Sequence, residues 1–190
     1  VGVYFYSGAS NAREAYDEAS YCISLIRDYQ ITYPVAFDWE LDGDYDSVTE
    51  ACETFCNVIS SYGYQPMVYS NRNRWYNNFD GEKIASKYKV WMAAYFGKFY
   101  YDSVRWTYGD ELPNFRYHYD MWQYSSRCYV DGISGQVDVD IAFFGYANYH
   151  VDTKDAVLTV TNKEIKRTYG DGIGRLTEEL NLLDGVKGIN

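Results

Sequence analysis

The stretch Val35-Ala36-Phe37-Asp38-Trp39-Glu40 decides the fold, because it is an apolar strand pattern that ends in two carboxylates. Side chains alternate along a strand, so Asp38 and Glu40 share one face while Phe37 and Trp39 share the other. The face with Phe37 can pack against helices. The opposite face then points to the middle of the fold, where a charge is costly unless it is paired or used. A catalytic pair is one reason to place two acids there.

The composition limits both the fold and the partners. With 190 residues and 47% hydrophobic content, the chain can bury a core and form one domain with a small appendage. No apolar run approaches the roughly 20 residues of a membrane-spanning helix, so we expect no membrane insertion. The net charge of −10 argues against nucleic acid, since phosphate binding needs clustered Lys and Arg.

Cysteine and histidine give no sign of a metal or cofactor site. The four cysteines match no zinc spacing, and Cys52 and Cys56 lie four residues apart on one expected helix, which is typical of buried free thiols. His118 and His150 are isolated in the sequence. We therefore expect no metal, no cofactor and no Ser-His or Cys-His nucleophile.

Strands and helices alternate along most of the chain. Strands are predicted at residues 1–6, 34–40, 65–70, 88–95 and 118–124, and on both sides of a turn at Ser134-Gly135. Helices are predicted from about 11 to 29 and from Ser47 to about Gly63, the second beginning with a capping box of Ser47 and Glu50. This order is typical of βα units around a parallel sheet, and both a right-handed barrel and a doubly wound sheet fit it.

Acids and aromatic residues gather at the carboxyl ends of the predicted strands, where barrel enzymes build their active sites. They are Asp38, Glu40, Tyr69, Tyr95, Trp122, Tyr124 and Asp138. This inventory suits cleavage of a glycosidic bond, in which a protonated carboxyl donates to the leaving oxygen and a carboxylate supports the positive sugar. An Asp-x-Glu triplet also arises by chance, and each of these aromatic residues fits a packed core equally well.

Six blocks follow one another over residues 1–146: Val3-Tyr4-Phe5, Phe37-Asp38-Trp39-Glu40, Val68-Tyr69-Ser70, Val90-Trp91-Met92-Ala93-Ala94-Tyr95, Met121-Trp122-Gln123-Tyr124-Ser125-Ser126 and Gly132-Ile133-Ser134-Gly135-Gln136-Val137-Asp138. Together they resemble the family 25 glycoside hydrolases, the N-acetylmuramidases of phage endolysins and bacterial autolysins. The most specific blocks are the Asp-x-Glu strand and the Trp-Gln-Tyr block with the Gly-x-x-Gly-x-Val-Asp turn. Family 18 chitinases also end a strand in Asp-x-Glu, but the later blocks fit them less well.

The resemblance implies an α/β fold, an irregular TIM-like (β/α) barrel, with residues 1–148 as a muramidase-like catalytic domain. It implies hydrolysis of the β-1,4 bond between N-acetylmuramic acid and N-acetylglucosamine in bacterial peptidoglycan. Such an enzyme acts on the cell wall, either secreted or phage-encoded and released at lysis.

The resemblance also assigns roles to single residues. Glu40 matches the family's general acid, Asp38 its neighbour on the strand and Asp138 the acid on the last strand. The charges of the two aspartates would help Glu40 to keep its proton. The cleft that binds the sugars would be lined by Tyr4, Tyr69, Tyr95, Trp122 and Tyr124. Asp140 shares a face with Asp138 but lies where the family often has Asn, so we rank it lower.

The chain departs from the family pattern at its start. The family begins with a strand carrying an Asp-x-Ser element and a second strand, both ahead of the region that Val1 matches, whereas here the only aspartates before Asp38 are Asp17 and Asp28. We therefore expect a barrel that is incomplete at the N-terminus and exposes an apolar edge at residues 1–6. A missing N-terminal segment, a second chain or an altered fold would cover this edge. The acetamido group of the substrate would then replace the absent acid.

Two other functions remain open: a catalytically silent module that binds cell-wall sugars, and a phage assembly module completed by another chain. Residues 149–190 are expected to be a linker or a small helical appendage. Within them, Tyr169-Gly170-Asp171-Gly172 is weakly similar to the cell-wall-binding repeats appended to some endolysins.

Overall fold

The computed structural model describes residues 1–144 and the backbone of residues 157–160 and 186–189. Its contacts divide the chain into two units, one of Val1–Arg105 with Leu112–Asn148 and one of Trp106–Glu111 with Tyr149–Asn190. None of the helices that the structure describes has the length and apolar character needed to span a membrane.

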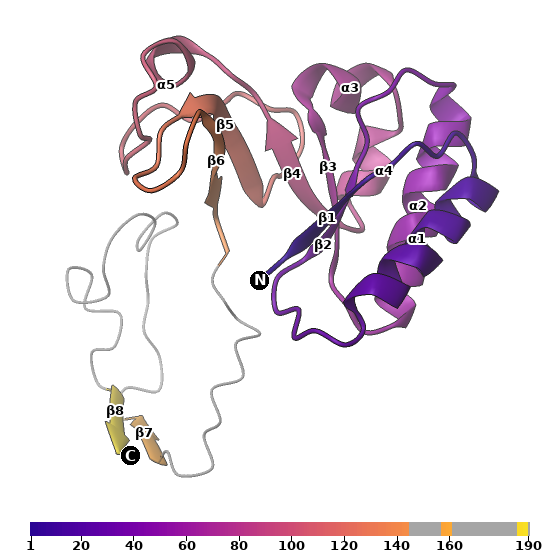
Figure 1. Ribbon diagram of the computed structural model, residues 1–190, viewed down its shortest axis with the longest axis horizontal. Coiled ribbons are helices and arrows are strands. Elements are labelled where there is room, and N and C mark those ends of the chain that lie inside the picture. The colour runs from indigo at the N-terminus through magenta and orange to yellow at the C-terminus, as the bar shows by residue number, and fades with distance from the viewer. Residues whose placement is uncertain (145–156, 161–185, 190) are drawn as a thin grey trace. The chain divides into compact units, whose positions relative to one another are not determined.

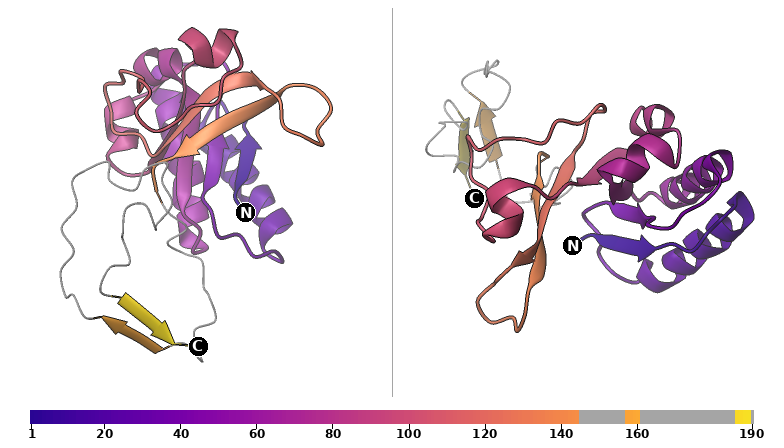
Figure 2. Two further views of the ribbon diagram at one scale, coloured as in Figure 1. Left: turned by 90° about the vertical axis from the view of Figure 1, so that its left-hand side faces the viewer. Right: turned by 90° about the horizontal axis from the view of Figure 1, so that it is seen from above.

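The first unit contains a six-stranded sheet (Figure 1). Its strands are β1 (Val3–Tyr6), β2 (Val35–Asp38), β3 (Pro66–Asn71), β4 (Lys89–Ala93), β5 (Met121–Cys128) and β6 (Val137–Ala142). The strands from β1 to β5 are parallel, and β6 returns antiparallel to β5 as one arm of a hairpin, which Figure 2 shows in side view. Each strand lies beside the one before it in the chain, without the reversal of a doubly wound sheet. The sheet is a curled half-barrel, which confirms the expected incomplete TIM-like barrel.

Two long helices cover the outer face of the sheet's first strands. They are α1 (Ala12–Ile26) and α2 (Tyr45–Ser61), and the short helices that follow are α3 (Arg72–Asn77), α4 (Gly81–Ala85) and α5 (Gly97–Tyr101). The Phe55 ring of α2 lies 5.0 Å from that of Phe37 in β2 and 5.9 Å from that of Phe5 in β1, measured between centroids. Because Phe37 is held outward, strand alternation turns Asp38 to the inner face.

The start of α2 differs from the prediction. We expected Ser47 to cap this helix with Glu50, but the helix begins at Tyr45 and its N-cap is Asp44. The Asp44 carboxylate accepts hydrogen bonds from the Ser47 backbone N–H at 3.1 Å and from its hydroxyl at 2.9 Å. Aspartate caps a helix as well as serine does, and the Asp44 side chain makes the capping hydrogen bond here.

One edge of the sheet is open. Among the described residues, β1 pairs only with β2, so the other side of β1 has no neighbouring strand. Tyr4 and Tyr6 of β1 point to the inner face and are 62% and 58% exposed. The exposed edge predicted at residues 1–6 is therefore confirmed.

Where the tail is described, it contains β7 (Val157–Val160) and β8 (Val186–Ile189), which pair antiparallel as a separate two-stranded sheet. The assignment of residues 149–190 as a linker or a small helical appendage stays a prediction. The helical stretch predicted at 175–183 and the similarity at 169–172 lie outside the described residues.

Candidate active site

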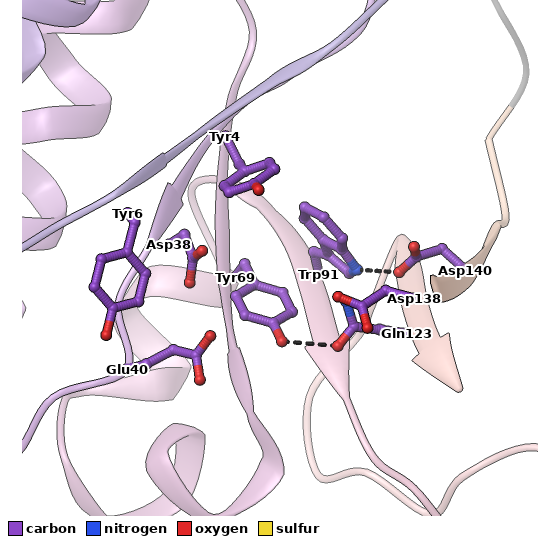
Figure 3. Close-up of a pocket in the computed structure, with 9 residues that line it drawn as sticks. All are labelled: Tyr4, Tyr6, Asp38, Glu40, Tyr69, Trp91, Gln123, Asp138 and Asp140. Carbon is purple, nitrogen blue, oxygen red and sulfur yellow. Dashed lines mark hydrogen bonds between the residues drawn. The ribbon is translucent and has the colours of Figure 1, made fainter. Parts of the chain in front are cut away.

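A hollow of about 560 Å³ lies on the inner face of the curled sheet (Figure 3). All six strands of the sheet, or the turns after them, contribute to its walls. Its lining consists of Tyr4, Tyr6, Asp38, Glu40, Tyr69, Trp91, Gln123, Asp138 and Asp140. Figure 3 shows Asp38 and Glu40 on one side of the hollow and the two acids of β6 on the other. The hollow therefore places carboxyl groups on both sides of a bound molecule.

Asp38 is the most buried acid of this hollow. Its side chain is at the end of β2, it is only 6% exposed, and its Oδ1 has no hydrogen-bond partner among the described residues. Burial, helped by the nearby charge of Glu40, raises the pKa of Asp38 to about 7. A proton on Asp38, or a donor from a ligand, would satisfy this buried oxygen.

The acids of β6 occupy different environments. Asp138 is exposed, whereas Asp140 is shielded and its Oδ1 accepts a hydrogen bond from the Trp91 indole N–H at 2.7 Å. Burial raises the pKa of Asp140 to about 7, the charge of Asp138 adds to this effect, and the Trp91 hydrogen bond opposes it. Asp38 and Asp140 therefore both hold a proton more readily than an exposed aspartate does.

Two tyrosine hydroxyls converge on one amide. Those of Tyr69 and Tyr95 both donate to Gln123 Oε1, the Tyr69 bond measuring 2.8 Å. Burial raises the pKa of Tyr95 to about 12 and that of Tyr69 further still, so both hydroxyls stay protonated. This cluster fixes part of the wall of the hollow.

The structure brings together five of the eight predicted site residues. Tyr4, Asp38, Glu40, Tyr69 and Asp138 line the hollow. Tyr95 borders it, because its hydroxyl reaches Gln123 while its ring stacks on Tyr100 at 5.3 Å between centroids.

Trp122 and Tyr124, predicted to contact sugar, do not line the hollow. Trp122 is 0% exposed and stacks on Phe96 at 5.6 Å, and its indole N–H donates to the Ala94 carbonyl. Tyr124 is also buried, with its ring 6.2 Å from that of Phe99. Alternation along β5 turns Gln123 inward and these two rings outward against α5 and the segment before it.

Sequence reasoning missed Tyr6, Trp91 and Gln123, and ranked Asp140 below the other acids. Tyr6 lies two residues beyond Tyr4 on the same face of β1, so alternation alone would have found it. Gln123 belongs to the Trp-Gln-Tyr block, in which only the two aromatic residues, Trp122 and Tyr124, were predicted to line the cleft. For Trp91 no signal distinguished an inward ring from an outward one.

The arrangement suits acid–base chemistry on a neutral, polyhydroxylated molecule. Carboxyl groups on facing walls can give a proton to one side of a bond and support positive charge on the other. Tyr and Trp rings offer flat apolar faces beside hydroxyl donors. The described residues contain no group of three or more His, Cys, Asp or Glu side chains arranged to hold a metal ion.

Comparisons with known proteins identify the family of most of this chain. The model of glycosyl hydrolases family 25 matches residues 1–133. The lysozyme of Streptococcus phage Cp-1 is 29% identical over an alignment of 137 residues, and the match covers 67% of this chain and 37% of that protein. The lysozyme of Streptococcus phage Cp-7 is 28% identical over an alignment of 182 residues, and the match covers 90% of this chain and 48% of that protein.

A solved structure is also similar to this chain. The modular autolysin LytC from Streptococcus pneumoniae, in complex with a synthetic peptidoglycan ligand, matches with a TM-score of 0.57 and 27% identity. The match covers 72% of this chain and 32% of LytC. The chain thus spans about half or less of the length of these three relatives.

Proposed function

Because the chain belongs to family 25 of the glycosyl hydrolases, we propose that it is a lysozyme that hydrolyses bacterial peptidoglycan between N-acetylmuramic acid and N-acetylglucosamine. The observation that carries this proposal is the hollow in which Asp38 and Glu40 face Asp138. The relatives named lysozyme, and the autolysin bound to a peptidoglycan ligand, support the same substrate class. The protein would then act on the cell wall, either secreted or phage-encoded and released at lysis.

In the proposed reaction Glu40 is the general acid. It follows β2 directly, lines the hollow and is less buried than Asp38. Glu40 gives its proton to the bridging oxygen as the bond between this oxygen and the anomeric carbon of the muramic acid breaks. The Glu40 carboxylate then removes a proton from the attacking water, which returns the site to its starting state.

Asp38 and Asp138 support the charge that develops. The unpartnered Oδ1 of Asp38 is an acceptor for the acetamido N–H of the substrate, which would aim the acetamido oxygen at the anomeric carbon. Attack by that oxygen forms a cyclic intermediate that water later opens, as in substrate-assisted glycosidases. Asp138 faces the reaction from β6 and stabilises the positive sugar electrostatically.

Clearing of purified cell walls tests the role of Glu40. We expect Glu40→Gln to abolish the fall in turbidity and the release of reducing ends, while Glu50→Gln, an exposed change on α2, leaves both intact. Reduction of the new ends with borohydride identifies the bond, since a muramidase yields muramitol and a glucosaminidase yields glucosaminitol. Equal clearing by wild type and Glu40→Gln would remove Glu40 from the proton-donor role.

We also propose that a strand outside the described sheet covers β1. Beside this edge lies an apolar hollow of about 200 Å³, which Val3, Ala36 and Met67 help to line, and strand addition would close it. Either a segment ahead of Val1 or a second chain would supply this strand. Native mass spectrometry distinguishes a second chain from the single polypeptide, and hydrogen exchange reports whether the β1 amides are protected. The Val3 and Ser7 amides already donate to the Pro34 and Asp38 carbonyls, so the test concerns the Tyr4 and Tyr6 amides on the open side. Free exchange of these two amides would contradict a covering strand.

For residues 149–190 we propose a segment, appended to the catalytic domain of residues 1–148, that helps to attach it to the cell wall. The supporting observation is that similarity to the Cp-7 lysozyme covers 90% of the chain, beyond the 133 residues of the family match. We expect the full chain to sediment with purified walls more completely than a version ending at residue 148. Equal sedimentation would leave this segment as a linker.

A further inference from the structure

Trp91 stands at the boundary between two hollows on the inner face of the sheet. It lines the acidic hollow of about 560 Å³ and also the apolar hollow of about 200 Å³. Tyr4, on the open edge strand, is the other residue common to both linings. The indole of Trp91 therefore offers an apolar surface in the lining of the acidic hollow.

Two contacts fix the ring of Trp91. Its indole N–H donates to Asp140 Oδ1 at 2.7 Å, and the Tyr69 ring meets it at 62° with the centroids 4.7 Å apart (Figure 3). Trp91 belongs to β4 and Asp140 to β6, so the hydrogen bond spans the intervening strand β5. In the register of β5 with β6, Asp140 lies beside Gln123. Gln123 in turn accepts a hydrogen bond from the Tyr69 hydroxyl. The ring is thus held from β3 on one side and from β6 on the other.

Asp140 differs in its surroundings from the acids given roles in the reaction. Asp138 is exposed and Glu40 lies beyond the end of its strand, whereas the shielded carboxyl of Asp140 is engaged by an indole. A shielded indole N–H that lost its acceptor would turn toward water or leave an unsatisfied donor. The hydrogen bond to the Asp140 carboxyl therefore restrains the orientation of the Trp91 indole.

We propose that Trp91 is a sugar-stacking residue of this cleft and that Asp140 is the positioning residue that fixes its ring. The ligand is the C–H face of a pyranose ring of the wall glycan, so the inference rests on the proposed function. A pyranose presents apolar C–H groups on its ring faces, and a flat indole covers such a face better than an aliphatic side chain does. The acids and tyrosine hydroxyls around Trp91 are suited to the hydroxyl and acetamido groups at the sugar's rim.

Four variants separate positioning from a general effect of charge. Asp140→Asn keeps a side-chain oxygen that accepts from the indole, whereas Asp140→Leu has a similar size and no acceptor. Trp91→Leu removes the flat ring, and the fourth variant combines Trp91→Leu with Asp140→Leu. Asp17→Leu, on the exposed face of α1, is the matched control for the loss of a carboxylate.

Calorimetric titration with soluble, peptide-free glycan strands measures binding directly. We expect Asp140→Leu and Trp91→Leu each to weaken binding about tenfold, and Asp140→Asn and Asp17→Leu to stay within roughly threefold of wild type. The double variant should bind no worse than Trp91→Leu, because residues that act as one unit are not additive. Asp140→Leu should also raise KM for the same strands more than it lowers kcat, as expected for lost binding.

Three results would overturn the inference: normal binding by Asp140→Leu, equal losses in Asp140→Asn and Asp140→Leu, or additive losses in the double variant. Failure of the proposed function has a different signature. If the wild-type chain binds glycan strands without cutting them, the proposed hydrolytic function is wrong. The binding series still tests Trp91 and Asp140 in that case. A wild-type chain that binds no glycan would overturn both.

Discussion

The Tyr69 hydroxyl donates to Gln123 Oε1 at 2.8 Å and so joins β3 to β5 across β4. The Tyr95 hydroxyl donates to the same oxygen, so a single side-chain amide satisfies two phenols. Gln123 itself is buried. One acceptor, Gln123 Oε1, therefore holds both tyrosines in the wall of the cleft. If either tyrosine is lost, the other still donates to this oxygen.

Replacement of that acceptor should destabilise the fold. We expect Gln123→Leu to lower the free energy of unfolding by about 2–4 kcal/mol, because two hydroxyls lose their partner. The melting temperature should fall by roughly 5–15 °C. Tyr69→Phe removes one donor and leaves Tyr95 bound, so its cost should be about 1 kcal/mol. Thermal denaturation followed by circular dichroism measures both, and a larger loss for Tyr69→Phe would contradict the shared-acceptor arrangement.

Stability should fall as the pH rises toward 8. The pKa values of Asp38 and Asp140 are about 7 in the folded chain, against an ordinary value of 3.8. The folded state therefore binds more protons than the unfolded state between about pH 4 and 7, and the stability due to these protons is lost as the pH passes through 7. We expect a loss of a few kcal/mol between pH 5 and 8.

Urea denaturation of wild type and Asp38→Asn at pH 5 and pH 8 measures this loss. The amide cannot ionise, so the difference between the two pH values should be smaller in the variant. A difference of the same size in both proteins would show that other groups cause the pH dependence.

Asp138→Asn should reduce activity far more than stability. The Asp138 side chain is exposed, so the substitution should change the free energy of unfolding by less than about 0.5 kcal/mol. Loss of its charge opposite the developing positive sugar should lower kcat by roughly a hundredfold or more. Kinetics on purified walls, paired with a melting curve, check both values. An unchanged kcat with a large drop in melting temperature would assign Asp138 to the fold.

Trp122 and Tyr4 should respond in opposite ways. Trp122→Ala empties a buried site and should cost about 3–5 kcal/mol of stability. Tyr4→Ser alters an exposed ring that lines the hollow, so it should weaken glycan binding with little change in stability. Melting curves and glycan titrations on both variants test this contrast. Weaker glycan binding by a stably folded Trp122→Phe variant would restore Trp122 to the cleft.

Local patterns in the sequence identified the parallel strands and the inward acids. The period of two in residues 35–40 turned Asp38 inward, because Phe37 had to meet a helix. The same local reasoning began α2 at Ser47, whereas the helix begins at Tyr45 with Asp44 as its cap. It also ended the fifth strand too early, since β5 runs to Cys128 through two irregularities in its pairing with β6.

The sequence by itself determined that this protein has an α/β fold with carboxylates at a strand end, because periodicity and strand order are local properties of the chain. Only the tertiary structure decided which aromatic rings reach the cleft. The Trp91 N–H donates to Asp140, two strands away in the sheet, and the Trp122 ring packs against Phe96 and Phe99. Alternation divides each strand into two faces, but the partners that show which face lines the cleft are distant in sequence.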